Sequence, residues 1–104
     1  MNMAIKEKIV SVAKHKILYL PHAVRQMSRP DRMISHEDIK EVVLQGRIIE
    51  EYADDPRGES YLMCYINSRP IHVVCSPKDE YLAIITAYLP DPKLWTDNFT
   101  KRIK

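Results

Sequence analysis

Histidine, tyrosine and arginine side chains give this sequence groups that could transfer protons and hold phosphate. Cleavage of RNA without a metal needs a base for the ribose 2′-hydroxyl, an acid for the leaving oxygen and cations for the charged phosphorane. Among the four histidines, His22 and His72 are candidates for proton transfer, together with Tyr88. The candidate phosphate ligands are Arg25, Arg57 and Arg69. The set can act together only if the helix that carries His22 packs beside the strand ends.

The spacing of these residues also allows structural roles. His22 and Arg25 are three residues apart, so they share one face of a short predicted helix. His72 alternates with Ile71 and Val73 on a predicted strand, so it points to the opposite sheet face from them. A single histidine on a strand is more often a packed or surface residue than a catalyst.

Arg57 lies in a loop, residues 53–59, that also contains several acidic side chains. It could be a mobile phosphate ligand, or it could simply pair with Asp54 or Asp55. Together with Glu59 these acids give only a weak signal for a metal site. The sequence contains no glycine-rich phosphate loop, nucleophile elbow or paired-histidine helix motif. We therefore expect chemistry without a metal or other cofactor.

The aromatic residues form a polar set, with six tyrosines and one phenylalanine. Such rings can stack on bases while their hydroxyls reach phosphates. Tyr61 and Tyr65 share one face of a predicted strand, and Thr86 and Tyr88 share one face of another. Amphipathic rings at the rim of the sheet are the structural alternative.

The composition indicates one globular domain. The chain has 104 residues, of which 45% are apolar and 29% charged, so we interpret residues 1–104 as a single unit with one core. No apolar run has the length of a membrane span or of a signal-peptide core. Cys64 and Cys75 lie in apolar runs, which favours buried reduced thiols in the cytoplasm over a disulfide between neighbouring strands.

The charge of the chain is unevenly distributed. The net charge of +2 is too small to indicate nucleic-acid binding by itself. Basic residues concentrate in residues 1–33 and 101–104, whereas acidic residues concentrate between Glu37 and Glu59. The folded chain could present one basic face, or it could have two solvated basic ends.

The first half of the sequence predicts helices joined by one short extended piece. The helices are predicted over residues 4–14, 21–28 and 36–45, and the extended piece over residues 17–20. The third helix has the clearest signal, because Ser35 is a good N-cap and Asp38 follows at the capping-box position. Gly46 stands where a glycine commonly ends a helix.

The second half changes to the alternating pattern of β-strands. Strands are predicted over residues 47–52, 61–66, 71–76 and 82–88. Short connections between the last three favour hairpins. The predicted fold class is α+β, with N-terminal helices packed on an antiparallel β-meander of about four strands. The sheet is expected to end before Trp95, and the residues beyond it to be loosely attached.

Several short segments, in a fixed order, resemble a known family. The segments are His22–Met27, the capped helix Ser35–Gly46, Ile48–Tyr52, Asp54–Gly58, Arg69–Val74, Ile85–Tyr88, Pro90-Asp91-Pro92 and Trp95. Their order and spacing resemble the small bacterial proteins grouped as domain of unknown function 4258. The resemblance covers roughly residues 17–95, which is most of the chain.

The resemblance implies a fold like that of the RelE and MqsR toxins, which cleave mRNA. It also implies a cognate antitoxin, a small zinc-finger protein of the YgiT type. His22, His72 and Tyr88 fall at positions that the family tends to keep, and Arg57 lies in its acidic-Pro-Arg-Gly loop. This chain has Gln26 where many members carry a basic residue directly before the methionine.

Three hypotheses follow for the function. The first is the toxin of a type II toxin–antitoxin system, a metal-independent endoribonuclease in which His72 is base or acid and Tyr88 and His22 assist. The second is an RNA-binding or ribosome-binding protein of the same fold that does not cleave. The third is a protein-interaction module whose sheet edge docks a partner. Such an edge could also pair with a second copy or join a toxin–antitoxin hetero-oligomer.

Overall fold

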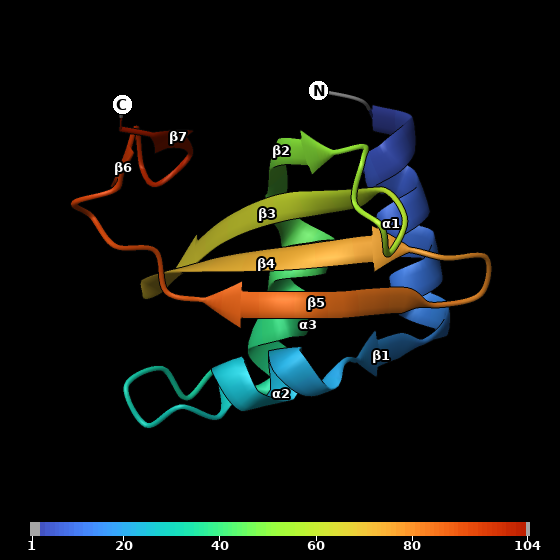
Figure 1. The fold of residues 1–104 in the computed structure, drawn as a ribbon, viewed down its shortest axis with the longest axis horizontal. Helices are drawn as coiled ribbons and strands as arrows, with labels where there is room; N and C mark the ends of the chain where they lie inside the picture. The colour runs from blue at the N-terminus through green and yellow to red at the C-terminus, as the bar shows by residue number, and fades with distance from the viewer. Residues whose placement is uncertain (1–2, 104) are drawn as a thin grey trace.

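The computed structural model describes residues 3–103 and contains three helices, a five-stranded mixed sheet and a separate two-stranded sheet (Figure 1). The helices are α1 (Met3–His15), α2 (Pro21–Met27) and α3 (His36–Gln45). The large sheet contains β1 (Ile17–Tyr19), β2 (Arg47–Tyr52), β3 (Ser60–Asn67), β4 (Arg69–Pro77) and β5 (Leu82–Tyr88). The small sheet contains β6 (Trp95–Thr96) and β7 (Lys101–Arg102). The predicted α+β class is confirmed.

Strands β2 to β5 form the antiparallel meander that the sequence predicts. The strand order across the large sheet is β1-β5-β4-β3-β2. The short extended piece before α2 joins this sheet as β1, which pairs in parallel with β5 from Ile17–Leu82 to Tyr19–Ile84. Because β1 has only three residues, its pattern of apolar and polar side chains is too short to specify a partner strand, and this pairing was not predicted.

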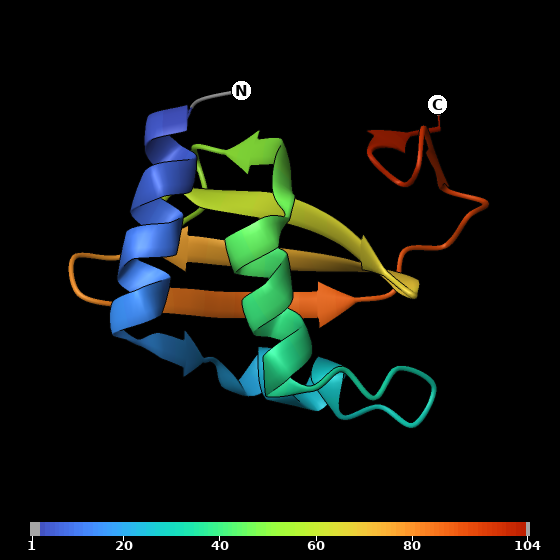
Figure 2. The ribbon, with the colours of Figure 1, turned by 180° about the vertical axis from the view of Figure 1, so that it is seen from behind.

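One face of the large sheet carries the hydrophobic core. Helices α1 and α3 contact each other and lie across this face, and α2 packs against β5 (Figure 2). Core side chains from these layers include Ile9, Ile39, Met63, Val73 and Ile84. Cys64 and Cys75 are buried free thiols, as predicted. None of the helices within residues 3–103 has the length and apolar character of a membrane span.

The start and end of α3 show how local sequence sets the helix boundaries. The predicted capping box is present, because Ser35 Oγ accepts the backbone N–H of Asp38 at 3.0 Å and the Asp38 carboxylate accepts that of Ser35 at 2.9 Å. Gly46 follows the helix, but its φ of −78° is extended rather than left-handed. An added Cβ would lie 2.4 Å from the Val42 carbonyl oxygen and 2.7 Å from that of Cys64. Close packing, not a left-handed turn, requires the glycine.

A β-bulge determines which side chains of β5 lie on the outer face, the face away from α1 and α3. Strict alternation would place Thr86 and Tyr88 on the same face as the core residue Ile84. The register of β4 and β5 shifts at this point and leaves Ile85 outside the one-to-one pairing. Thr86 and Tyr88 therefore move to the outer face, and Tyr88 pairs directly with His72 of β4.

The residues after Trp95 depart most from the sequence-based expectation. The sequence predicted no element there, but residues 95–102 form the β6–β7 hairpin (Figure 1). Trp95 is only 6% exposed because it packs against His72. No alternation or turn pattern in the sequence signals this tertiary contact.

Candidate functional site

His72 and Tyr88, two of the predicted catalytic residues, are in direct contact. The Tyr88 hydroxyl lies 3.1 Å from Nδ1 of His72. The other ring nitrogen, Nε2, lies 2.8 Å from the carbonyl oxygen of Phe99. A carbonyl oxygen only accepts, so Nε2 carries the proton, and in the neutral ring Nδ1 accepts the Tyr88 hydroxyl. Both nitrogens of His72 are therefore occupied.

The surroundings of His72 favour its neutral form and exclude solvent. The residue is 0% exposed, and the rings of Tyr88 and Trp95 lie edge-on to it, with centroid distances of 5.2 and 4.5 Å. Burial lowers the pKa of His72, although the hydrogen bond to Phe99 and the charge of Glu50 oppose this shift. Burial also raises the pKa of Tyr88. In this conformation His72 cannot contact a substrate.

A charged cluster next to this pair was missed by sequence reasoning. Arg102 Nε and Nη2 donate to the two carboxylate oxygens of Glu50 at 2.7 and 3.0 Å, and the guanidinium lies over the Trp95 ring, 4.7 Å from its centroid. The Tyr52 hydroxyl donates a hydrogen bond to the same carboxylate. Burial and that hydrogen bond raise the pKa of Tyr52 to about 12. The sequence offered only an acidic strand and a basic run as signals.

An open pocket of about 380 Å³ lies beside the covered pair on the same sheet face. Helix α2, the loop after β2 and the adjoining parts of β4 and β5 contribute its lining residues, which are His22, Tyr52, Asp55, Pro56, Arg57, Val74, Ile85 and Thr86. Val74 and Thr86 pair with each other two residues along the strands from His72 and Tyr88. Thus the structure brings His22 and Arg57 together, next to the other two candidates.

Asp55 holds the loop that carries Arg57. The Arg57 Nε and Nη2 atoms lie 3.0 and 3.2 Å from the Asp55 carboxylate, which also accepts the Arg57 backbone N–H at 2.9 Å. The hydroxyl of Ser60 adds a bond of 2.8 Å. These bonds, led by the Arg57 side chain, hold the pKa of Asp55 well below its usual range. Arg57 is thus an ion-pair partner of Asp55, yet its side chain stays 56% exposed.

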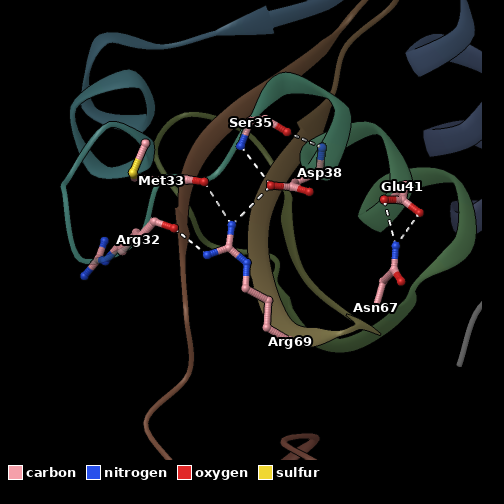
Figure 3. A network of polar contacts seen from close by, with 7 residues as sticks. All are labelled: Arg32, Met33, Ser35, Asp38, Glu41, Asn67 and Arg69. Atoms are coloured by element: carbon pink, nitrogen blue, oxygen red, sulfur yellow. Dashed lines mark hydrogen bonds and ion pairs between the residues drawn. The ribbon is translucent and has the colours of Figure 1, made fainter.

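Arg69 and Arg25 do not line this pocket. Figure 3 shows the Arg69 guanidinium reaching the carbonyl oxygens of Arg32 and Met33 and, at 3.2 Å, the Asp38 carboxylate. These contacts tie the loop after α2 to the start of α3. Arg25 is exposed on α2. The structure therefore gives Arg69 a role in holding a loop and leaves Arg25 outside the pocket.

The tyrosines of β3 and the scattered acids contribute little to this face. Tyr61 is buried in the core and donates to Glu59 at 2.9 Å, and Tyr65 packs against the same core. Neither ring is placed to stack on a base from the outer face. Within residues 3–103, no group of three or more histidine, cysteine, aspartate and glutamate side chains is placed to hold a metal ion.

Comparison with known proteins finds one family. The family described as Domain of unknown function (DUF4258) matches residues 19–89, more than half of the chain. The matched segment contains His22, Arg57, His72 and Tyr88. No curated protein and no solved structure matches the chain.

Proposed function

This chain belongs to the DUF4258 family, and from its outer sheet face we propose that it is the toxin of a type II toxin–antitoxin system, a metal-independent endoribonuclease that cleaves mRNA. The observation that carries the proposal is that His22 and Arg57, which come from separate elements, line one open pocket. The strands beneath this pocket continue to His72 and Tyr88. Imidazole, guanidinium and hydroxyl groups are those that metal-free phosphodiester transfer uses.

Arg57 would hold the phosphate at the cleavage point. Arginine has five N–H groups, of which two point to Asp55, so three remain for phosphate oxygens. The pKa of Asp55 lies well below its usual range, so its carboxylate is ionised and offsets much of the guanidinium charge. Phosphate binding at Arg57 would therefore depend on hydrogen-bond geometry more than on net charge.

The proton transfers would begin at His22, which is exposed at the pocket. His22 would take the proton of the 2′-hydroxyl, whose oxygen then forms a bond to phosphorus. The bond from phosphorus to the 5′-oxygen breaks, and that oxygen takes a proton from the Tyr88 hydroxyl, or from His72 once that residue is uncovered and protonated. The products would be a 2′,3′-cyclic phosphate and a 5′-hydroxyl end.

A cognate antitoxin in the same cytoplasm is part of this proposal. An enzyme that cleaves cellular mRNA inhibits its own host unless a partner neutralises it. The family resemblance suggests a zinc-finger protein of the YgiT type as that partner. Growth arrest by the chain alone, relieved when the partner is expressed with it, would support the pair.

The experiment that tests the proposal is controlled expression in bacteria, followed by assay of the purified chain on single-stranded RNA in EDTA. We expect growth arrest and RNA fragments ending in cyclic phosphate. Arg57→Ala should lose both effects. Arg29→Ala is the matched control, because Arg29 makes a similar pair with Asp31 two residues away, outside the pocket. Normal growth and intact RNA with soluble wild-type protein would contradict the proposal.

A second function is favoured by the burial of His72. Because both of its ring nitrogens are engaged and it is 0% exposed, the outer face could bind RNA without cleaving it. This alternative predicts salt-sensitive RNA binding with no product. Binding without cleavage in the same RNA assay would therefore favour it over the endoribonuclease.

A further inference from the structure

The β6–β7 hairpin covers His72 with contacts that a nucleotide could replace. The Trp95 ring packs against the imidazole at a centroid distance of 4.5 Å. The Phe99 carbonyl oxygen accepts the Nε2 proton at 2.8 Å. A nucleobase can take the place of an aromatic ring, and a phosphate oxygen can accept the same N–H. The hairpin thus presents to His72 the two kinds of group that a strand of RNA carries.

The hairpin is tied to the large sheet at few points. Each of its strands has two residues. Its polar contacts to the described part of the large sheet are the bond from His72 to Phe99, the bonds from Arg102 to Glu50 and a bond from Arg102 to the Tyr52 hydroxyl oxygen. The Arg102 side chain is 60% exposed, so solvent competes for this ion pair. The attachment is therefore specific but open to competition.

The loop of the hairpin has a strained backbone. Asp97, Asn98 and Phe99 have φ values of 52°, 56° and 66°, in the left-handed region. Aspartate and asparagine tolerate this region, but a bulky residue such as phenylalanine is an outlier there. Such a conformation persists only where surrounding contacts impose it. Bonds from Thr100 to Thr96 and Asp97 within the hairpin hold this loop, and the Phe99 carbonyl oxygen accepts the hydrogen bond that links it to His72 of the sheet.

From these observations we propose that the β6–β7 hairpin is an autoinhibitory cover, and that single-stranded RNA extending from the pocket displaces it from His72 and Tyr88. This inference rests on the proposed function, because it takes RNA as the ligand. Val74 and Thr86 at the pocket are two residues along the strands from the covered pair, a separation of about 7 Å. An RNA strand lying along β4 and β5 would contact both regions.

Histidine footprinting with diethylpyrocarbonate, read by mass spectrometry, tests whether the hairpin lifts. His15, His22 and His36 are exposed and serve as internal references in every sample. In the wild-type chain His72 should be modified far more slowly than these three. In Arg102→Ala we expect its modification to be at least tenfold faster, with the references unchanged.

Two further variants separate the contact from the charge. Arg102→Lys keeps the charge but loses the two-pronged bond to Glu50, so it should give an intermediate rate. Lys93→Ala removes one exposed positive charge from the chain before the hairpin and should match wild type. Circular dichroism checks that each variant is folded. If His72 is modified equally slowly in wild type and in folded Arg102→Ala, the proposal that the hairpin is a releasable cover is wrong.

Displacement by RNA is measured with a 2′-O-methyl oligoribonucleotide, which lacks the attacking hydroxyl. Trp95 is the single tryptophan of the chain, so its acrylamide quenching reports on the hairpin. Saturating oligonucleotide should raise the quenching of wild type at least twofold, and Arg102→Ala should bind it about fivefold more tightly than Lys93→Ala. Binding that leaves the quenching of Trp95 unchanged would overturn displacement by RNA.

The histidine footprint and the oligonucleotide experiment together show whether the cover, the proposed function or both are wrong. If no variant binds the oligonucleotide, the proposed function and the displacement by RNA both fail. The footprint, which uses no RNA, still decides whether the hairpin lifts when Arg102 is changed. If RNA binds and is cleaved while His72 stays protected in Arg102→Ala, the endoribonuclease stands and the cover is wrong.

Discussion

The open pocket and the covered pair lie side by side on one sheet face, yet they leave different groups free. In the pocket, His22 and Arg57 are both exposed and come from separate elements. In the covered pair, both nitrogens of His72 are bonded and Trp95 closes the site. Residue type and strand position thus identify a candidate residue, whereas solvent access and free hydrogen-bonding capacity decide what that residue can do.

The two regions also balance charge differently. In the pocket, one guanidinium faces one carboxylate on a surface loop, and Arg57 keeps N–H groups directed away from Asp55. Beside the covered pair, Glu50 receives bonds from both Arg102 and Tyr52. Burial raises the pKa of Glu50, but those bonds outweigh it, so the pKa is lowered and the carboxylate stays ionised at neutral pH. The second arrangement is suited to holding a segment rather than binding a new anion.

The largest effect is expected from His22→Ala, which removes the exposed base of the pocket. RNA cleavage in EDTA should fall by about a hundredfold or more, the usual contribution of a positioned acid or base. Stability should hardly change, because His22 is exposed. His15→Ala, which removes an exposed histidine from α1, is the control. Cleavage at the wild-type rate in His22→Ala would show that the pocket is not the site of chemistry.

The next largest effect is expected from His72→Ala, which should lower the stability of the fold. The change opens a cavity under Trp95 and leaves the Tyr88 hydroxyl without its bond to Nδ1. We expect the free energy of unfolding to fall by about 3 kcal/mol, as for loss of a large buried side chain with its hydrogen bonds. Urea denaturation followed by circular dichroism measures this change. A loss below about 0.5 kcal/mol, the range of surface substitutions, would mean that the covered pair is not a packing unit.

A smaller effect is expected from Tyr88→Phe, which keeps the ring and removes the hydroxyl. His72 then loses the donor to Nδ1, and the loss should be about 1 kcal/mol in the free energy of unfolding. Tyr81→Phe, in the connection between β4 and β5, provides the comparison. Equal stability of the two variants would show that the bond between Tyr88 and His72 adds nothing to the fold.

The smallest effect is expected on the attachment of the hairpin when the pH is lowered from 7.5 to 5.5. Burial lowers the pKa of His72 below its ordinary value of 6.5, so the covered state binds its proton less readily than an open or unfolded state does. The contribution of this site to stability is thus complete above pH 6.5 and declines as the pH falls below it. Trp95 quenching should therefore increase between pH 7.5 and 5.5.

The control for the pH experiment is a His72→Gln variant, which keeps a polar side chain but does not titrate. The charged and titratable groups near His72 are Glu50, Arg102, Tyr88 and Cys64, which pairs directly with it. Glu50 has a lowered pKa, Arg102 a raised one through its bond to Glu50, and burial raises the pKa of Tyr88 and of Cys64. None of the four titrates between pH 5.5 and 7.5. The same quenching change in the variant would assign the effect to another group.

Much of the secondary structure could be predicted because its signals are local. The capping box at Ser35 and Asp38 starts α3 where predicted, and alternation places β2 to β5. The prediction missed the role of β1 in the sheet, because its three residues pair with a strand more than sixty residues away in the chain. It also missed the β6–β7 hairpin, because that hairpin is held in place by contacts with His72 and Glu50, which are distant in the sequence.

The site could be predicted only as a set of residue types. His22, His72, Arg57 and Tyr88 all lie on or beside the outer face, whereas Arg69 holds the loop after α2. The cluster of Glu50, Tyr52 and Arg102 was missed, because Arg102 and Glu50 are 52 residues apart. No pattern along the chain connects such residues.

The α+β class, the capped third helix and the antiparallel meander can be predicted from the sequence alone, because caps, alternation and short turns depend on neighbouring residues. The contact between Tyr88 and His72 could not be predicted in this way, since it depends on a bulge at Ile85 that reverses the alternation of β5. The folded structure is also needed to tell which candidate residues are exposed. His22 reaches a pocket and His72 lies beneath the hairpin, because exposure is set by what packs above each residue.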